Sequence, residues 1–228
     1  MQYMKDLKAW LDSIEDTPLE EMDAFFTARL VGYEEHMLEH WEEGYRHIAK
    51  LLPAEAKRIL DLGCGTGLEL DEIFKLRPDI AVTGMDLSAS MLGELQKKHA
   101  DKNLCVICGS YFDEPFPGPF DAMISFESLH HFTAAEKLPL FKKIYDALVP
   151  GGVFMNGDYF ACCDEEETLL RETCDRRRAA QGIPAGQFVH FDTPLTEVHE
   201  MQVLRDAGFG EVYVDPTPEA SHIVIAKK

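Results

Sequence analysis

The residues best suited to chemistry form a glycine-rich segment with an acidic residue on each side. Gly63-Cys-Gly-Thr-Gly67 follows a short apolar segment, residues 58–62, and precedes a helical segment, residues 68–76. Glycines in a turn between a strand and a helix let the backbone approach a ligand closely. Asp86 ends the next apolar segment, where a carboxylate can accept hydrogen bonds from both hydroxyls of a ribose. The pattern predicts a nucleotide site at the carboxyl end of a parallel sheet.

Asp61 distinguishes between two classes of nucleotide. A carboxylate directly before the glycine-rich turn would repel a diphosphate held at the N-terminus of the following helix. It suits a ligand that has an ammonium group and no phosphate, such as S-adenosylmethionine. In addition, Leu68 stands where a dinucleotide fingerprint has glycine or alanine. An NAD-dependent oxidoreductase on a related fold is therefore the disfavoured alternative.

Alternating strands and helices must position these residues. Short apolar segments cover residues 58–62, 80–87, 104–109, 120–126 and 153–157, and helical segments cover 68–76, 88–98 and 134–148. This rhythm predicts an α/β fold with a doubly wound, mostly parallel seven-stranded sheet and helices on both faces. Residues 211–214 and 222–226 flank Asp215-Pro-Thr-Pro218 and predict an antiparallel hairpin at the C-terminal edge.

Two parts of the chain lie outside this alternation. Residues 1–52 carry apolar side chains at helical spacing from about Leu19 to Leu52, and we expect an N-terminal helical lid on a domain spanning 53–228. Tyr33, Met37 and Trp41 either cover the ligand or form ordinary helix packing. Residues 160–194 form an insertion, which we expect to be a second wall of the acceptor site, with Phe188, His190 and Phe191 facing the substrate.

From about residue 55 to 228, the sequence resembles the class I S-adenosylmethionine-dependent methyltransferase family. The matching segments are Ile59 to Gly67, Val82 to Ser88, Phe120 to Ser125, Leu148 to Phe154 and Leu195 to Phe209. The resemblance implies a Rossmann-like domain, S-adenosyl-L-methionine as cofactor, S-adenosyl-L-homocysteine as product, and methyl transfer by in-line displacement. A non-catalytic S-adenosylmethionine-binding protein, and an enzyme that transfers another group from a modified cofactor, remain alternatives.

The resemblance also implies which residues bind the cofactor. Asp61, Gly63 and Gly65 would line its methionine part, Asp86 would hold the ribose, and Leu87 and Met91 would lie against the adenine. Ser110 stands where family members often have an acidic residue for the adenine amino group, and Tyr111 or Phe112 could stack on the purine instead. Arg29 is a candidate partner for the cofactor carboxylate, because the core strands offer few cations. Three further residues complete the predicted cofactor site: Tyr33, Cys64 and Phe126.

Methyl transfer requires alignment of the acceptor with the methyl group, and a general base only where the acceptor must lose a proton. We expect the acceptor beyond the fourth strand, near Glu127 to His131. His130 or His131 is the candidate base, because histidine titrates near neutral pH; the alternative is that they cap or pack the next helix. We expect no metal, because Met37 stands between His36 and His40 where a zinc-binding HExxH motif has glutamate.

Charge and composition narrow the choice of partners. The chain has 228 residues and a formal net charge of −19. Such a chain repels phosphate backbones and anionic lipid surfaces. We therefore expect a small-molecule acceptor, no nucleic acid, no membrane, and a monomer or homodimer. The first residues have neither the basic nor the apolar region of a signal peptide, which predicts a cytoplasmic protein.

Two other groups of residues predict structural roles. A cluster of three arginines predicts a solvated helix face whose positive charge offsets the negative charge of Glu165 to Glu167; the arginines are Arg176, Arg177 and Arg178. Cys105 and Cys108 lie on a strand predicted to be buried, where residues three apart face opposite sides and cannot share a metal or a disulfide. We expect all six cysteines to be reduced: Cys64, Cys105, Cys108, Cys162, Cys163 and Cys174.

Overall fold

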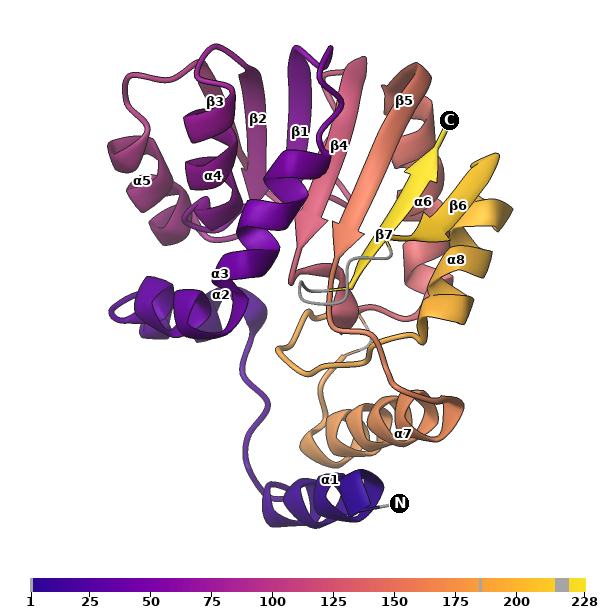
Figure 1. Cartoon of the computed structure of the whole chain (residues 1–228). Coiled ribbons are helices and arrows are strands. Elements are labelled where there is room, and N and C mark those ends of the chain that lie inside the picture. The colour runs from indigo at the N-terminus through magenta and orange to yellow at the C-terminus, as the bar shows by residue number, and fades with distance from the viewer. Residues whose placement is uncertain (1, 185, 216–221) are drawn as a thin grey trace.

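The computed structural model describes residues 2–184, 186–215 and 222–228. Within these residues one seven-stranded sheet has the order β3-β2-β1-β4-β5-β7-β6 (Figure 1). Neighbouring strands from β3 to β5 are parallel, and β7 is antiparallel to both β5 and β6. The predicted fold class is therefore confirmed, including the antiparallel pairing of β6 with β7 at the C-terminal edge, whereas residues 216–218 of the expected turn lie outside the described residues. The strands are β1 (Arg58–Leu62), β2 (Ala81–Asp86), β3 (Leu104–Cys108), β4 (Phe120–Phe126), β5 (Leu148–Gly157), β6 (Glu211–Val214) and β7 (Ile223–Lys227).

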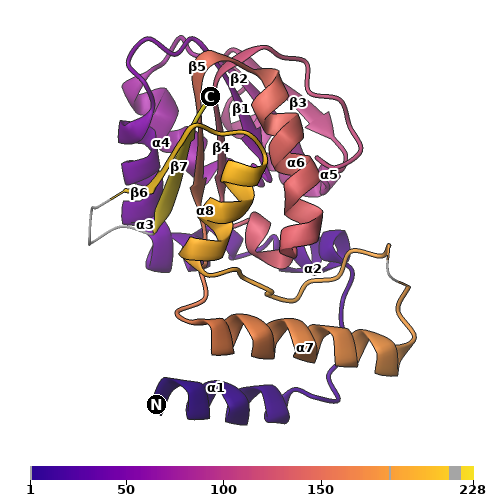
Figure 2. The ribbon, with the colours of Figure 1, turned by 90° about the vertical axis from the view of Figure 1, so that its right-hand side faces the viewer.

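Helices cover both faces of the sheet (Figure 2). On one face, α3 (Tyr33–Leu51), α4 (Leu68–Leu76) and α5 (Ala89–Lys98) contribute to one apolar core. On the other face, α6 (Ala134–Ala147) and α8 (Glu197–Asp206) contribute to a second core. Because β1 lies between both layers, Ile59, Leu60 and Leu62 are each fully buried. This explains why its sequence is a continuous apolar run rather than an alternating one.

The edge of the sheet corrects one expectation. β3 is the edge strand, and both Cys105 and Cys108 are exposed, so the prediction of a buried strand is wrong. The strand lacks a neighbour on one side and is only partly covered by α5, because the segment that follows it forms a loop rather than a helix. All six cysteines are free thiols in the structure.

A further layer lies below the carboxyl ends of the parallel strands. There α1 (Gln2–Ser13) and α7 (Asp164–Gln181) lie side by side, and α2 (Met22–Arg29) connects them to the main body (Figures 1 and 2). Leu11, Leu170, Cys174 and Phe191 form a small apolar core between them. Helix α1 was not predicted from the sequence. The helical segment expected from Leu19 to Leu52 is also broken, because Gly32 adopts a left-handed conformation between α2 and α3.

The arginine cluster on α7 joins this layer together. Arg176 forms an ion pair with Glu15 at 2.7 Å, and Arg178 donates to the carbonyl groups of Pro184 and Gln187. Arg177 is only 3% exposed. The prediction of a solvated helix face that balances Glu165 to Glu167 is therefore wrong for Arg177, which the chain after α1 covers, whereas Arg176 is exposed but pairs with Glu15.

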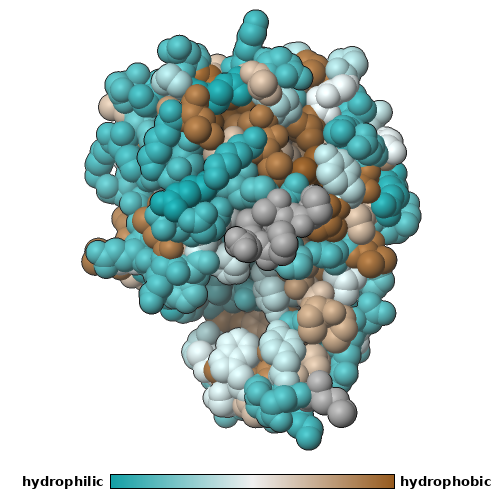
Figure 3. Space-filling model, in the orientation of Figure 1, coloured by the Kyte–Doolittle hydropathy of each residue, from teal (hydrophilic) through white to brown (hydrophobic). Residues whose placement is uncertain are grey.

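The surface agrees with the acidic composition. Most of the face seen in Figure 3 is hydrophilic, and the formal net charge of the chain is −19. In the part of the chain that the structure describes, no helix combines the length and apolar character that crossing a membrane requires.

Candidate functional site

A cavity lies where β1, β2 and β4 end. It has a volume of about 60 Å³ and is lined by the ends of these strands, by the loops after them and after β3, and by α2, α3 and α5. This is the edge at which open parallel sheets bind ligands. The predicted residues in its lining are Tyr33, Gly63, Gly65, Asp86, Leu87, Met91, Tyr111, Phe126 and His131.

The first two glycines of the turn, Gly63 and Gly65, have different roles. Gly63 has φ +73°, and a Cβ atom there would lie 2.0 Å from Oγ of Ser128, so any side chain would displace the loop after β4. Gly65 has φ +48°, and its Cβ would meet only the Tyr33 hydroxyl, at 3.7 Å. The turn is fixed to β2 because the backbone N–H of Gly63 donates to the Met85 carbonyl at 2.8 Å. Gly63 therefore permits close packing within the protein, whereas Gly65 leaves room for a ligand.

Asp86 presents a carboxylate of fixed orientation to the cavity. Its Oδ2 accepts a hydrogen bond from the Gly65 N–H at 2.9 Å, and its Oδ1 accepts one from the Ser88 N–H at 2.8 Å. Burial raises the pKa of Asp86, although these two backbone donors oppose the change. Each carboxylate oxygen retains capacity for another donor. The side chain is thus held ready to accept hydrogen bonds from a ligand.

Buried acids lie close to the cavity. Asp61 is fully buried, and neither of its carboxylate oxygens has a hydrogen-bond partner among the described residues. Burial, and then the neighbouring Glu69 carboxylate, raise the pKa of Asp61 well above its usual range, and burial raises the pKa of Glu69 to about 7. No lysine or arginine lines the cavity in the described chain. A bound cation would relieve this concentration of acidic groups.

Glu127 was missed as a site residue. It lines the cavity with a side chain only 8% exposed, and its Oε1 has no partner among the described residues. Burial raises its pKa to about 8. Its φ of 49° is the one positive value among the described non-glycine residues, and such strain often occurs at functional sites. Its place directly after β4 was the available signal in the sequence. The other lining residues not predicted are Met22, Asp23, Phe26, Ser88, Ser128 and Phe132.

Four predicted cofactor residues do not line the cavity. Arg29 forms an ion pair with Glu20 at 2.8 Å and lies over the Phe25 ring. Asp61 is enclosed by protein. The Cys64 side chain is buried in the core between the sheet and α4. The Ser110 hydroxyl accepts a hydrogen bond from the Phe112 N–H at 3.2 Å and stabilises the loop after β3.

The two adjacent histidines have different environments. Nδ1 of His130 lies 2.6 Å from Asp158, and Nε2 lies 3.5 Å from Asp192. Burial lowers the pKa of His130, but the charges and hydrogen bonds of these two carboxylates outweigh it and raise the pKa well above its usual range. His130 is therefore an imidazolium ion at neutral pH and does not line the cavity.

His131 does line the cavity. Burial, followed by the charge of His130, lowers its pKa, so the ring is neutral at pH 7. Nδ1 lies 3.3 Å from both the Phe191 carbonyl oxygen and the Asp192 carboxylate. With the Nδ1 proton directed at these acceptors, Nε2 carries a free lone pair. Of the two predicted bases, this environment suits only His131 to accept a proton.

The insertion contributes aromatic residues next to this site. Phe188 packs against Phe112 and Phe132, with ring centroids 5.7 and 5.6 Å apart. His190 stacks on Phe25 of α2 at 3.5 Å. Burial, followed by the charges of neighbouring histidines, lowers the pKa of His190 to about 4, so this ring is neutral too. The insertion and α2 thus enclose the histidine side of the cavity together.

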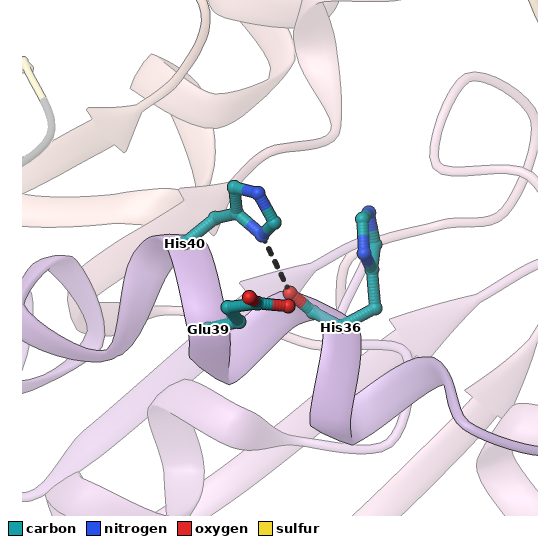
Figure 4. Close-up of side chains that lie close together, drawn as sticks. All are labelled: His36, Glu39 and His40. Atoms are coloured by element: carbon teal, nitrogen blue, oxygen red, sulfur yellow. Dashed lines mark hydrogen bonds between the residues drawn. The ribbon is translucent and has the colours of Figure 1, made fainter.

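His36, Glu39 and His40 lie close together on the exposed side of α3 (Figure 4). Their potential metal-ligand atoms are within 4.8 Å of one another. Nδ1 of His40 hydrogen-bonds to the His36 carbonyl oxygen at 2.9 Å, which leaves Nε2 free. None of the three residues lines the cavity.

Comparisons with known proteins agree with this geometry. Residues 59–152 match the family described as "Methyltransferase domain". A carboxy-S-adenosyl-L-methionine synthase from Campylobacter fetus subsp. fetus is 29% identical over 175 residues, which cover 72% of this chain and 74% of that protein. A malonyl-acyl-carrier-protein O-methyltransferase from Priestia megaterium is 31% identical over 106 residues, or 44% of this chain and 38% of that protein.

A solved structure shares the fold. Human N-acetylserotonin methyltransferase, in complex with S-adenosylmethionine, superposes with a TM-score of 0.64 at 19% identity. The match covers 86% of this chain and 55% of the human protein, so the chain spans little more than half of that relative.

Proposed function

We propose that this chain is a class I S-adenosylmethionine-dependent methyltransferase, which transfers a methyl group from S-adenosylmethionine to a small-molecule acceptor. The observation that carries the proposal is the pairing of Asp86 with the open glycine turn at Gly65. The carboxylate is fixed by two backbone donors, and a Cβ atom at Gly65 would meet only the Tyr33 hydroxyl within 4 Å. Together they suit a ribose whose hydroxyls need acceptors.

The residues present fit this cofactor. Asp61 is a buried carboxylate without a partner, and Glu69 and Glu127 are buried acids nearby. S-adenosylmethionine has two cationic groups and no phosphate. Asp86 would hold the ribose, Leu87 and Met91 would contact the adenine, and Glu127 with the Gly63 to Gly65 turn would border the methionine part. Asp61 would act from behind the turn without direct contact, because a bound cation favours the ionised form of a carboxyl whose pKa burial raises.

When bound, the cofactor supplies a methyl group on a sulfonium, a leaving group that needs no further activation. The protein then has to align the acceptor and exclude water. We assign His131 as the general base, with Nε2 accepting the proton of a hydroxyl or amine acceptor. Asp192 and the Phe191 carbonyl orient its ring, and burial, followed by the charge on His130, lowers its pKa and favours the neutral form.

The charge of the cavity supports methyl as the transferred group. The Campylobacter relative is named a carboxy-S-adenosyl-L-methionine synthase, and a carboxylated cofactor would bring an additional negative charge. Glu127, Asp86 and Asp23 line this cavity without a lysine or arginine among the described residues. An additional carboxylate would therefore lack a cationic partner here, and an unmodified methyl sulfonium is the better match.

Two measurements test the proposal. Titration calorimetry with S-adenosylhomocysteine should give binding, and the same titration with NADH should give none; the reverse result would identify a dinucleotide enzyme. Incubation with methyl-labelled S-adenosylmethionine and a panel of hydroxyl, amine and carboxylate metabolites should transfer label to at least one of them. Binding without any transfer would instead support a protein that senses the cofactor. Location in the cytoplasm and a monomeric or homodimeric state stay predictions.

A further inference from the structure

A second cavity lies between the α1–α7 layer and α2. It has a volume of about 340 Å³. Side chains from α1, α2, α7 and the insertion contribute to it, so segments far apart in the sequence meet there (Figure 2). The apolar part of its wall consists of Leu7, Trp10, Ile14, Phe25, Leu170 and Phe191.

Arg177 is a buried cation in this wall without an acidic partner. The residue is 3% exposed, and among the described residues no ion pair joins it to a carboxylate. Nη2 donates to the Thr17 carbonyl oxygen at 2.6 Å, while Nε has no hydrogen-bond partner in the described chain. Buried charges are normally paired, because an unpaired one pays its full desolvation cost. The guanidinium lies 5.3 Å from the centroid of the Phe191 ring and acts on Glu15 through its charge, but no carboxylate of the described chain forms a direct ion pair with it.

The other charged groups of the cavity are already satisfied. Arg29 is paired with Glu20 at 2.8 Å. Asp192 lies 3.5 Å from His130 and 3.3 Å from His131, and the charges and hydrogen bonds of these rings hold its pKa well below its usual range. Arg177 is thus the one unbalanced charge among the described lining residues. An anion bound in this cavity would meet a guanidinium that has no direct ion pair.

A wall of rings separates the second cavity from the first. His131 lines the first cavity and His190 lines the second, and their ring centroids are 4.9 Å apart. Consecutive residues of α2 are divided in the same way, because Phe26 lines the first cavity and Phe25 the second. A molecule in the second cavity therefore lies against the residues that carry the assigned base.

We propose that the second cavity binds a ligand with an aromatic body and one carboxylate, which pairs with Arg177. The apolar and aromatic wall suits the body, and the planar guanidinium suits a carboxylate. A phosphate monoester would bring about two charges, and the single cation without an ion pair would leave one of them uncompensated. The inference concerns a site separate from the cofactor cavity, and it can be tested independently of the proposed function.

The test compares two probes with the same body, 4-phenylbutyrate and 4-phenylbutyramide. The chain has two tryptophans, so a Trp41→Phe background leaves Trp10, in the wall of the second cavity, as the single fluorescent reporter. We expect the carboxylate to bind at least about tenfold more tightly than the amide and to change the Trp10 emission. Equal affinities of the two probes would overturn the inference, even without any further variant.

Variants at Arg177 and at its neighbour Arg176 then test which residue causes the preference for the carboxylate probe. Arg177→Met should abolish the tenfold preference, and Arg177→Lys should retain part of it, because lysine keeps the charge but lacks the planar fork. Arg176→Met is the matched control, since this neighbour is exposed and paired with Glu15, and it should keep the full preference. A preference that survives in a folded Arg177→Met protein would refute the assignment. If S-adenosylhomocysteine binds and the preference is absent, this inference alone fails; if the preference is present and S-adenosylhomocysteine does not bind, only the proposed function fails.

Discussion

Nδ1 of His130 lies 2.6 Å from Oδ1 of Asp158, and both side chains are buried. This pair, with Asp192 near the other ring nitrogen, keeps His130 protonated. The ring of His131 lies 4.0 Å away, and the neighbouring charge helps to lower its pKa. Two consecutive histidines therefore have opposite protonation states at neutral pH, and a sequence motif alone does not distinguish them.

His131→Gln should slow methyl transfer by about 10²–10⁴-fold, the usual contribution of a general base, and leave S-adenosylhomocysteine affinity nearly unchanged. Because a base must be neutral and the pKa of His131 is lowered, the wild-type rate should be flat above neutral pH and fall only in acid. Rates with labelled cofactor across pH 5–9 check both points. His199→Gln, at an exposed histidine paired with Glu167, is the control. Equal rates for His131→Gln and wild type would remove the residue from this role.

Asp86→Ala should weaken S-adenosylhomocysteine binding by about 1–3 kcal/mol, the range for losing hydrogen bonds to a charged group. The expectation follows from the fixed position of its carboxylate beside Gly65 and Ser88. Titration calorimetry measures the change, and Asp113→Ala, an exposed residue in the loop after β3, serves as the control. Unchanged affinity in Asp86→Ala would contradict the ribose assignment.

Gly65→Ala should reduce cofactor binding more than it reduces stability. The new Cβ meets only the Tyr33 hydroxyl at 3.7 Å, so the chain tolerates it, but it occupies space kept for the ligand. Gly182→Ala is a matched control, because its φ is also positive, at +66°, and nothing lies within 4 Å of the added atom. Both variants should lose about 1 kcal/mol of unfolding free energy through backbone strain. If both variants bind S-adenosylhomocysteine as tightly as wild type does, the cofactor does not occupy the space beside Gly65.

Glu127→Gln should become more stable relative to wild type as pH rises. Burial raises the folded-state pKa of Glu127 to about 8, so the folded protein holds this proton more tightly than the unfolded chain does. Stability is therefore lost in wild type as pH rises from the unfolded pKa, about 4.3, through the folded value. Thermal melts at pH 5, 7 and 9 measure the difference between the two proteins. A difference that stays constant over this range would show that Glu127 titrates normally.

The local part of the site was predictable from the sequence. The strand, glycine turn and helix around Gly65 are contiguous in the chain, and Asp86 ends the next strand, so a short-range pattern placed them together. The alternation of strands and helices is also a short-range pattern of the sequence, and it predicted the parallel sheet. The histidines were found as a pair, but their separate roles depend on Asp158 and Asp192, which come from two later segments.

What the sequence did not reveal depends on long-range contacts. Arg29 was predicted to bind a cofactor carboxylate, but its guanidinium forms an ion pair with Glu20, nine positions earlier in the chain. Arg177 seemed solvated, because nothing in α7 indicates that the chain near Thr17 covers it. Glu127 owes its importance to a backbone conformation that residue type does not predict, since glutamate rarely adopts positive φ. Each of these outcomes is decided by tertiary structure rather than by propensity.

The pairing of α1 with α7 has a consequence for the order of events during synthesis. The ion pair of Arg176 with Glu15 and the hydrogen bond of Arg177 to Thr17 span 161 and 160 residues. During synthesis α1 leaves the ribosome long before α7 has been translated. Until then, the apolar side chains of Leu7, Leu11 and Ile14 remain exposed to solvent. The second cavity, which Arg177 lines, can therefore form only late, after most of the sheet has been translated.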